Sequence, residues 1–358
     1  MNSQSENVSV FMQRLPGFRV KQEMPYEWKR DYAAKLAKEF YDRVTLQMGA
    51  NVHISVGGLD SLTLFYFLRD YCGLDVPAVS VSSLEDRSIQ KIHAEIGCIS
   101  LIPYKNKCEV LQEFGFPIIS KDSANKIKTL YHPTTKNKTV RHAIMTGECG
   151  KQGHFAKNSR MKLAAKWLRL FAGVENKNYG TDYQIAPFPV SDDCCYWMKE
   201  LPCDDWAKKH NSFPYLGLMA SEGGRRQKAL IANGCNYFGK TVVRSCPFAI
   251  FSRQDLLRLA LDLSVPVPEI YGFIDRKEDG SLFTTKAQRT GCVMCGFGIH
   301  LDKRPHHFDR LYYRNPKEWD FWMYKCIKHE DGSKYGWGEV LTYIGVDWQN
   351  PDEVKPRG

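Results

Sequence analysis

The pattern of apolar and polar positions changes period repeatedly between residues 50 and 115. Residues 51–55 form an apolar run of strand length, and residues 60–71 carry apolar side chains at helical spacing before Gly73. This alternation is typical of a parallel sheet whose strands are joined by crossover helices. The same pattern predicts further strands at 76–81 and 99–103 and a helix at 108–114.

Helical spacing is also present before the first strand, where it predicts one helix from Trp28, Tyr32, Leu36, Phe40 and Val44. Later patterns predict helices at 161–171, 225–232 and 252–263, a strand at 215–219, and a hairpin that turns at Asp279-Gly280. Residues 308–327 form an aromatic helical stretch, and we expect a break near Pro316.

These elements predict an α/β fold: a Rossmann-like parallel sheet with helices on both faces, and a cysteine-containing C-terminal helical region. We expect three parts, which are a helical leader at 1–49, an α/β domain at 50–270 and a C-terminal region at 271–358. In such a sheet, ligands bind at the carboxyl ends of the strands.

The net charge of +10 is concentrated in one segment of the chain. Residues 121–170 contain twelve Lys or Arg against Asp122 and Glu148, which matches the whole excess. Within this segment, residues 131–160 are polar and lack periodicity, so we expect a long loop or insertion. A local field of one sign favours a polyanion such as nucleic acid, and a solvated basic face is the alternative.

The 358 residues are 43% hydrophobic and 25% charged, which is typical of a globular protein. The longest apolar run, near residues 62–68, is far shorter than the roughly 20 residues of a membrane helix. The first ten residues lack a signal-peptide pattern. We therefore expect a cytoplasmic protein with no membrane partner. Among its twelve cysteines, Cys194-Cys195 and Cys292-x-x-Cys295 suggest metal or cluster ligands.

The turn after the first strand is rich in glycine and reads Ser55-Val56-Gly57-Gly58-Leu59-Asp60-Ser61. Glycines there let backbone N–H groups surround an anion, and the helix N-terminus behind them adds partial positive charge. Ser61 can add a hydroxyl, and Asp60 can cap the helix or hold a metal ion. Because any tight turn favours glycine, the prediction rests on the longer Gly-Gly-x-Asp-Ser pattern.

This pattern resembles the pyrophosphate loop (PP-loop) of the adenine nucleotide alpha-hydrolase superfamily, usually Ser-Gly-Gly-x-Asp-Ser, with Val56 in place of the first serine. Later motifs, in the same order, resemble the phosphoadenosine phosphosulfate (PAPS) reductase family, in members often encoded by phages or mobile elements. These motifs are Gly217-Leu218-Met219-Ala220-Ser221-Glu222, Arg225-Arg226, Gly234-Cys235-Asn236, Cys246-Pro247-Phe248, residues 252–256, residues 290–301, Phe308-Asp309-Arg310-Leu311 and Tyr343-Ile344-Gly345-Val346.

The resemblance spans residues 50–348 and implies a HUP-type sheet with a PP-loop nucleotide-binding domain at 50–270. It implies that ATP or PAPS is held by Ser55, Gly57, Gly58, Asp60, Ser61, Gly217, Met219 and Glu222. Asp60 would help to position Mg²⁺, and Asp60, Ser61, Arg225 and Arg226 would be catalytic. In this scheme, Arg225 or Arg226 stabilises the departing pyrophosphate. Met219 stands where the family has Arg, and Gly223 where it has Ser.

The cysteine layout resembles that of the cluster-bearing adenylylsulfate reductases. It implies a [4Fe–4S] cluster on Cys194, Cys195, Cys292 and Cys295, and a structural zinc is the alternative. If one cysteine of the first pair belongs to the core instead, Cys235 is the substitute ligand. The other cysteines are expected to be small buried hydrophobes, namely Cys72, Cys98, Cys108, Cys149, Cys203, Cys246 and Cys326.

Three functions fit this sequence. The first is an iron–sulfur enzyme that binds an adenine nucleotide, adenylylates an acceptor and assists sulfur transfer, with nucleic acid on residues 121–170 and a sulfur donor protein as partners. The second is a sulfonucleotide reductase that releases sulfite. The cysteine layout favours it, but the C-terminal Glu-Cys-Gly-type tail is not found and Cys326 lies in a predicted helix. The third is a non-catalytic nucleotide- or nucleic-acid-binding module, which Val56 favours.

Overall fold

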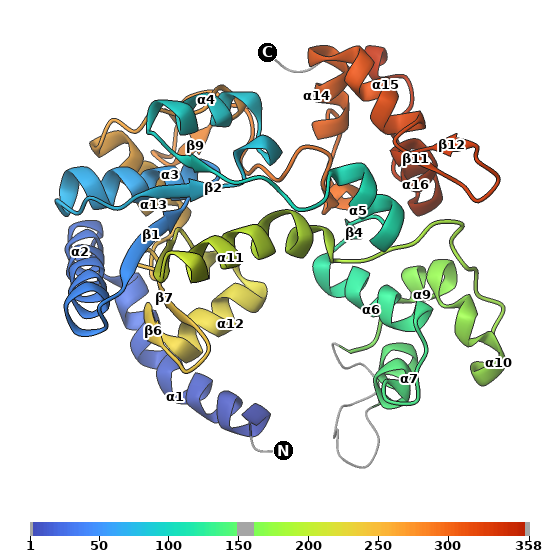
Figure 1. Ribbon diagram of the computed structural model, residues 1–358, viewed down its shortest axis with the longest axis horizontal. Helices are drawn as coiled ribbons and strands as arrows, with labels where there is room; N and C mark the ends of the chain where they lie inside the picture. The colour runs from blue at the N-terminus through green and yellow to red at the C-terminus, as the bar shows by residue number, and fades with distance from the viewer. Residues whose placement is uncertain (1–2, 149–160, 355–358) are drawn as a thin grey trace. The chain divides into compact units, whose positions relative to one another are not determined.

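The structure is a computed structural model that describes residues 3–148 and 161–354. The chain divides into two compact units (Figure 1). The first comprises Met1–Ile102 and Leu201–Val293, and the second comprises Pro103–Glu200 and Met294–Gly358. Each unit is therefore built from two separate stretches of chain, and the domain expected at 50–270 includes residues of both units.

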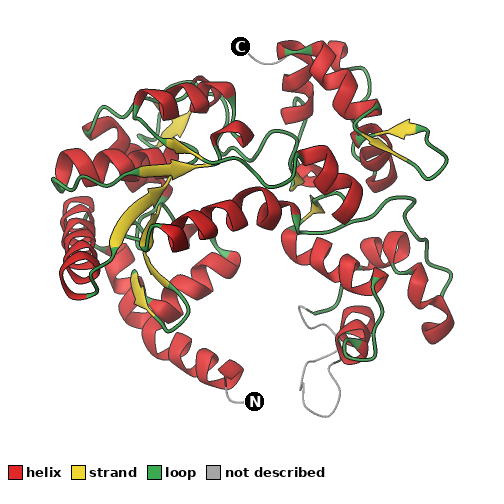
Figure 2. Cartoon of the chain, viewed as in Figure 1, coloured by secondary structure: helices red, strands yellow, loops and turns green. Residues whose placement is uncertain are grey.

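The first unit is built around a mostly parallel sheet, whose strands are drawn in yellow in Figure 2. Its strand order is β3-β2-β1-β5-β7-β6. Strand β1 (Asn51–Ser55) pairs in parallel with β2 (Ala78–Ser80) on one edge and with β5 (Ser212–Leu216) on the other. Strands β3 (Ile99–Ser100) and β7 (Val243–Ser245) extend the parallel part, and β6 (Asn236–Phe238) is antiparallel to β7. The sheet grows in opposite directions from β1, which makes β1 and β5 a topological switch point.

Two helices of this unit precede β1, and the others follow strands in sequence, as the alternating pattern predicts. They are α1 (Ser3–Glu23), α2 (Tyr26–Asp42), α3 (Leu59–Tyr66), α4 (Arg87–Glu95), α11 (Leu201–Lys209), α12 (Gly224–Asn233) and α13 (Arg253–Asp262). The π-helical turns η1 (Arg43–Gln47) and η2 (Phe67–Tyr71) extend α2 and α3. The predicted hairpin is formed by β8 (Ile274–Arg276) and β9 (Leu282–Thr284).

Helices cover both faces of the central strand. Val52 and Ile54 are buried in a core cluster that also contains Phe40 of α2. His53 lies between them in sequence and therefore points to the opposite face, because side chains alternate along a strand. There its ring packs edge-on against Trp206 of α11, with the ring centroids 5.2 Å apart. The predicted α/β fold with a mostly parallel sheet and helices on both faces is confirmed.

Helix α13 begins at the capping box that the sequence indicates. The Asp255 N–H donates to Ser252 Oγ (3.2 Å), and the Ser252 N–H donates to Asp255 Oδ2 (2.7 Å). The same carboxylate oxygen accepts a hydrogen bond from the Lys29 ammonium group at 2.5 Å, and both side chains are buried. A buried charge is stable only when it is paired, so this contact fixes α2 against α13.

The second unit is mainly helical. Its helices are α5 (Lys107–Phe114), α6 (Lys121–Tyr131), α7 (Lys138–Thr146), α9 (Ala165–Phe171), α10 (Asn176–Tyr179), α14 (His307–Arg314), α15 (Pro316–Tyr324) and α16 (Trp337–Ile344). Short strands pair as β4 (Ile118–Ile119) with β10 (Gly296–Phe297), and β11 (Ile327–Lys328) with β12 (Lys334–Tyr335). Trp337 is fully buried and packs against Phe116 and Phe308.

Three sequence-based expectations are corrected here. Helix α1 was not expected, because its apolar residues follow no helical stripe; it packs on α12. The loop expected at 131–160 contains helix α7, whose Ala143, Ile144 and Met145 are buried, so tertiary packing stabilises it. Residues 149–160 of that loop lie outside the described residues. Pro316 does separate two helices, as predicted, but Cys326 follows α15 instead of lying inside a helix.

We also find that every helix in the described ranges is too short or too polar to cross a lipid bilayer.

The buried His53 ring predicts a pH dependence of stability. Its Nδ1 lies 2.8 Å from Ser212 Oγ, and burial lowers its pKa from 6.5 to about 4. Between these two pH values the unfolded chain binds a proton that the folded chain does not. The free energy of unfolding therefore falls as the pH drops from 6.5 towards 4, by up to about 3 kcal/mol from this group.

Urea unfolding of the wild type and of His53→Asn at several pH values between 7.5 and 4.5 measures this contribution. The Asn side chain can keep a hydrogen bond to Ser212 but does not titrate, so the variant is expected to lose part of the pH slope. Equal slopes for the two proteins would contradict the prediction.

Candidate functional site

The turn between β1 and α3 is closed by hydrogen bonds of its own residues. The Gly57 N–H donates to Ser61 Oγ (2.7 Å), and the Ser61 hydroxyl donates to the Gly58 carbonyl (3.0 Å). Gly58 is the N-cap residue of α3, so Asp60 does not cap the helix. The Val56 side chain is buried in the core and does not replace the missing serine hydroxyl. The turn thus has the predicted strand–turn–helix form.

A tyrosine hydroxyl occupies the N-terminal end of α3. The Leu59 N–H donates to the Tyr271 hydroxyl (3.2 Å), which lies 2.6 Å from Thr290 Oγ1. A Cβ atom on Gly58 would overlap the same hydroxyl, so glycine is required there. The first N–H groups of a helix are the groups that bind anions. In this structure an oxygen atom of the protein holds one of these positions.

The turns that follow β1, β2 and β5 meet at one edge of the sheet, because parallel strands end on the same side. A Cβ atom on Gly217, after β5, would lie 3.0 Å from the Asp60 carbonyl oxygen and from Ser61 Cα. On the other side, His93 Nε2 of α4 lies 2.9 Å from the Gly57 carbonyl oxygen. This edge is the switch point of the sheet, where α/β proteins bind ligands.

Charged side chains surround this turn and are paired with one another. Asp60 forms an ion pair with Arg253, which also donates to the Gln288 carbonyl (3.0 Å). Burial raises the pKa of Asp60, and the charge of Arg253 opposes this rise. Glu222, whose side chain is 4% exposed, binds Arg226 at 2.6 Å and Arg289 at 3.3 Å. Three guanidinium groups thus face two carboxylates, and guanidinium groups also bind phosphate well.

The structure brings most of the predicted binding residues to this edge, namely Ser55, Gly57, Gly58, Asp60, Ser61, Gly217 and Glu222. Arg226 lies in the first turn of α12, and its side chain is 53% exposed. The Met219 side chain is buried in the core, so only its backbone faces Glu222. Arg225 belongs to α12, but its side chain lies outside the described residues.

Sequence reasoning assigned no role to four residues of this edge: Arg253, Arg289, Tyr271 and Thr290. Arg253 lies in the motif at 252–256, directly after the capping serine, and Thr290 is the first residue of the motif at 290–301. Both motifs were identified, but they indicate no contact for these two residues. Their contacts join positions far apart in the chain, such as Asp60 and Arg253, which are 193 residues apart. No local sequence signal indicates such a pair.

The four predicted cluster ligands are divided between the units. Cys292 belongs to the first unit, whereas Cys194, Cys195 and Cys295 belong to the second. The buried Cys194 thiol donates to the Met198 sulfur at 3.6 Å. In residues 3–148 and 161–354, no group of three or more Cys, His, Asp or Glu side chains is arranged to hold a metal ion. The metal-ligand set therefore stays a prediction.

The substitute ligand Cys235 is buried in the first unit, where the Cys246 N–H donates to its carbonyl oxygen (2.8 Å). Burial raises the pKa of the Cys235 thiol to about 12 and that of Cys246 to about 11, so both thiols stay protonated at neutral pH. Of the cysteines expected in the core, Cys72, Cys246 and Cys326 are buried, Cys98, Cys108 and Cys203 are half-buried, and Cys149 lies outside the described residues.

The basic segment 121–170 is partly neutralised in the fold. Four of its nine described cations form ion pairs with carboxylates, as Lys121–Glu200, Lys126–Asp122, Lys128–Asp193 and Arg141–Glu175. Three of these carboxylates lie after residue 170, so the net charge of residues 121–170 does not include them. Lys151, Lys157 and Arg160 lie outside the described residues. The field of the described part is weaker than the sequence indicates.

These contacts define an α/β sheet edge suited to an anionic ligand, with a glycine turn, a helix N-terminus and three arginines. A comparison of the chain with protein-family models, with curated proteins and with solved structures found no match. A functional assignment therefore rests on this geometry and on the motifs themselves.

Tyr271→Phe tests whether the tyrosine hydroxyl competes with an anion. Removing it frees the Leu59 N–H, so we expect pyrophosphate to bind about 2- to 10-fold more tightly, the range of one ordinary hydrogen bond. The free energy of unfolding should fall by about 1 kcal/mol, because the Leu59 N–H and the Thr290 hydroxyl lose their hydrogen-bond partner.

Isothermal titration calorimetry measures the affinity for pyrophosphate, and urea unfolding measures the change in stability. Tyr237→Phe is the control. Weaker pyrophosphate binding by Tyr271→Phe would show that the hydroxyl assists the anion, contrary to the prediction.

Proposed function

We propose that the first unit binds the phosphates of an adenine nucleotide, ATP or PAPS, and that the protein is a PAPS reductase-like PP-loop enzyme with a HUP-type sheet. The observation that carries this proposal is the meeting of the Gly57-Gly58 turn with the Gly217 turn at the switch point of the sheet. The adenine base and the sulfur chemistry rest on the motif resemblance.

In this proposal, phosphate oxygens exchange with carboxylates as partners of the arginines. Arg253 leaves Asp60 and Arg226 leaves Glu222, and both guanidinium groups bind the ligand instead. The released Asp60 carboxylate would be free to hold Mg²⁺, a cation that prefers oxygen ligands. Binding of nucleotide and of Mg²⁺ is therefore coupled through one ion pair.

The proposed reaction is adenylylation. An acceptor atom attacks the α-phosphorus of ATP, the bond to the bridging oxygen breaks, and pyrophosphate leaves with its electron pair. Arg226 and Arg289 form ion pairs with Glu222 at the edge where negative charge would develop on the departing pyrophosphate. Guanidinium groups stabilise such charge. The predicted cysteine ligands are not assembled in the described residues, so we route no step through a cluster or a zinc ion.

One observation opposes the sulfonucleotide reductase alternative. A reductase of that kind needs an accessible thiolate as nucleophile. Cys326, the last cysteine of the chain, is buried, and burial raises the pKa of its thiol to about 12. It is therefore protonated and shielded at neutral pH.

A second observation favours the non-catalytic binding module as the runner-up. The N–H groups of Gly57 and Leu59 already donate to oxygens of the protein, Ser61 Oγ and the Tyr271 hydroxyl. A loop of this kind can hold a nucleotide through its arginines without the full set of backbone contacts. Binding of ATP without release of pyrophosphate would identify this function.

Gly57→Ala tests the proposed loop. The added methyl group would meet no protein atom closer than 3.5 Å, so the variant should fold normally. A phosphate that approaches the loop backbone would collide with it, and we expect at least roughly tenfold weaker binding of Mg-ATP. Isothermal titration calorimetry measures the affinity of the wild type, of Gly57→Ala and of the control Gly17→Ala for Mg-ATP. If Gly57→Ala binds as tightly as the wild type, the loop does not hold the phosphates.

Metal analysis tests the cysteine prediction separately. After anaerobic purification, we expect about four iron and four sulfide per chain, lost in Cys292→Ala/Cys295→Ala and kept in the control Cys98→Ala. Zinc in place of iron would select the structural-zinc alternative. A wild-type protein without bound metal would refute both.

A further inference from the structure

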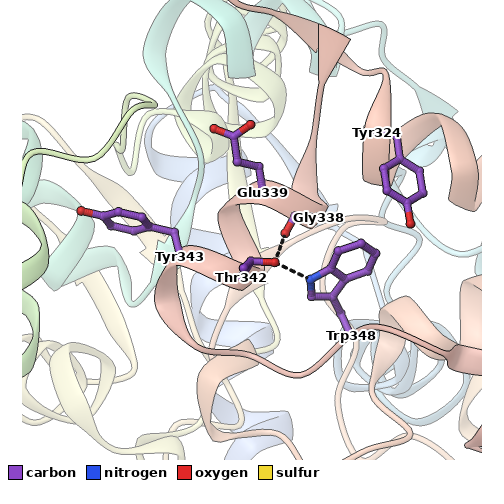
Figure 3. Close-up of a pocket in the computed structure, with 6 residues that line it drawn as sticks. All are labelled: Tyr324, Gly338, Glu339, Thr342, Tyr343 and Trp348. Carbon is purple, nitrogen blue, oxygen red and sulfur yellow. Dashed lines mark hydrogen bonds between the residues drawn. The ribbon is translucent and has the colours of Figure 1, made fainter.

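The second unit carries an open groove of about 320 Å³ over helix α16 (Figure 3). Its lining residues are Tyr324, Gly338, Glu339, Thr342, Tyr343 and Trp348. In Figure 3, Tyr324 and Trp348 lie on one side of Gly338, and the Glu339 carboxylate points away from the helix above it. The lining therefore combines three aromatic side chains with one acidic group, and Tyr324 and Trp348 lie together.

The aromatic side of the groove is held in place by the fold. The indole N–H of Trp348 donates to Thr342 Oγ1 (2.9 Å), and the Thr342 hydroxyl donates to the Gly338 carbonyl (2.8 Å). A Cβ atom on Gly338 would lie 2.8 Å from the Trp348 ring, so glycine lets the indole approach the helix. Trp348 also packs against Tyr324, with ring centroids 5.7 Å apart. A ligand would find these rings already oriented.

The stretch of sequence that supplies the groove is acidic, although Asp320 and Asp347 within it pair with Lys325 and Arg304. Residues 316–353 contain four lysines and eight carboxylates, a net charge of −4, whereas the chain carries +10. Glu339 lies 3.2 Å from His329 Nε2 and remains partly exposed. A cation over the face of Trp or Tyr is attracted by the ring, and a nearby carboxylate adds to this attraction. The same charge disfavours nucleic acid, whose phosphates would be repelled.

We propose that this groove binds a lysine or arginine side chain from a basic segment of a partner protein. Trp348 is only 7% exposed, so the aliphatic part of such a side chain would lie on the exposed Tyr324 ring that packs against it, and its charged end would reach Glu339. Phe321, which is 41% exposed, lies one turn before Tyr324 on α15 and extends the apolar surface beyond the groove. This larger surface suits a peptide better than a single amino acid. The proposal does not depend on the nucleotide site.

The test uses the whole protein and a blocked tetra-arginine peptide, with the citrulline version of the peptide as the uncharged control. Isothermal titration at low salt should show binding of the arginine peptide that weakens as salt is added. Glu339→Gln and Tyr324→Ala should each weaken it roughly fivefold. Tyr324 is 45% exposed, so its removal should leave the fold intact, which unfolding curves verify. Glu330→Gln removes the same charge from an exposed residue outside the groove and should change affinity less than about twofold.

Several outcomes would overturn the proposal. Equal affinity for the citrulline peptide would mean that positive charge is not recognised. Equal effects of Glu330→Gln and Glu339→Gln would mean that net charge, and not the groove, attracts the peptide. If a single-stranded oligonucleotide binds and Tyr324→Ala abolishes this binding, the surface binds nucleic acid instead. If the arginine peptide does not bind at millimolar concentration, the groove is not a site for basic segments. ATP affinity should be the same in Glu339→Gln and wild type, which separates this site from the proposed nucleotide site.

Discussion

Strand β1 is paired on both edges, and the candidate site of the first unit depends on that pairing. Its parallel register with β5 runs from Asn51 opposite Ser212 to Ser55 opposite Leu216, and β2 continues the sheet on the other edge. Because the strands are parallel, the turns after them open on the same side. Gly217 reaches the backbone of Asp60 and Ser61 for this reason, although more than 150 residues separate them. The buried pair Lys29–Asp255 then fixes the helix that carries Arg253.

The charged and polar groups of the candidate site have partners within the protein. Arg253 and Arg226 bind carboxylates, and the N–H groups of Gly57 and Leu59 donate to hydroxyl oxygens. Buried polar groups need such partners, since an unpaired one costs about 1–3 kcal/mol. An anionic ligand therefore has to replace existing contacts one for one. The net gain from binding is the difference between two sets of contacts, and a cation on Asp60 would help to balance it.

Charge along the sequence and charge on the fold differ in this protein. The run of basic residues in 121–170 is partly cancelled by Glu175, Asp193 and Glu200, which lie later in the chain. Conversely, the acidic residues of 316–353 accompany exposed aromatic side chains such as Tyr324 and Phe321. A local charge count therefore overestimates the first surface, and the exposed aromatic side chains beside the acidic residues are known only from the fold.

The sequence alone determined the elements whose signals are local. The strand–glycine turn–helix at β1 and α3, the Ser252 capping box and the β8–β9 hairpin follow from glycine, capping residues and periodicity, which act over a few neighbouring residues. The sequence also placed Gly57, Asp60, Gly217 and Glu222 in one site. Helix α7, the position of Cys326 and the contacts of Arg253, Arg289 and Tyr271 needed the tertiary structure. Their partners are distant in the chain, and burial and ion pairing between distant segments leave no periodic trace in the sequence that could indicate them.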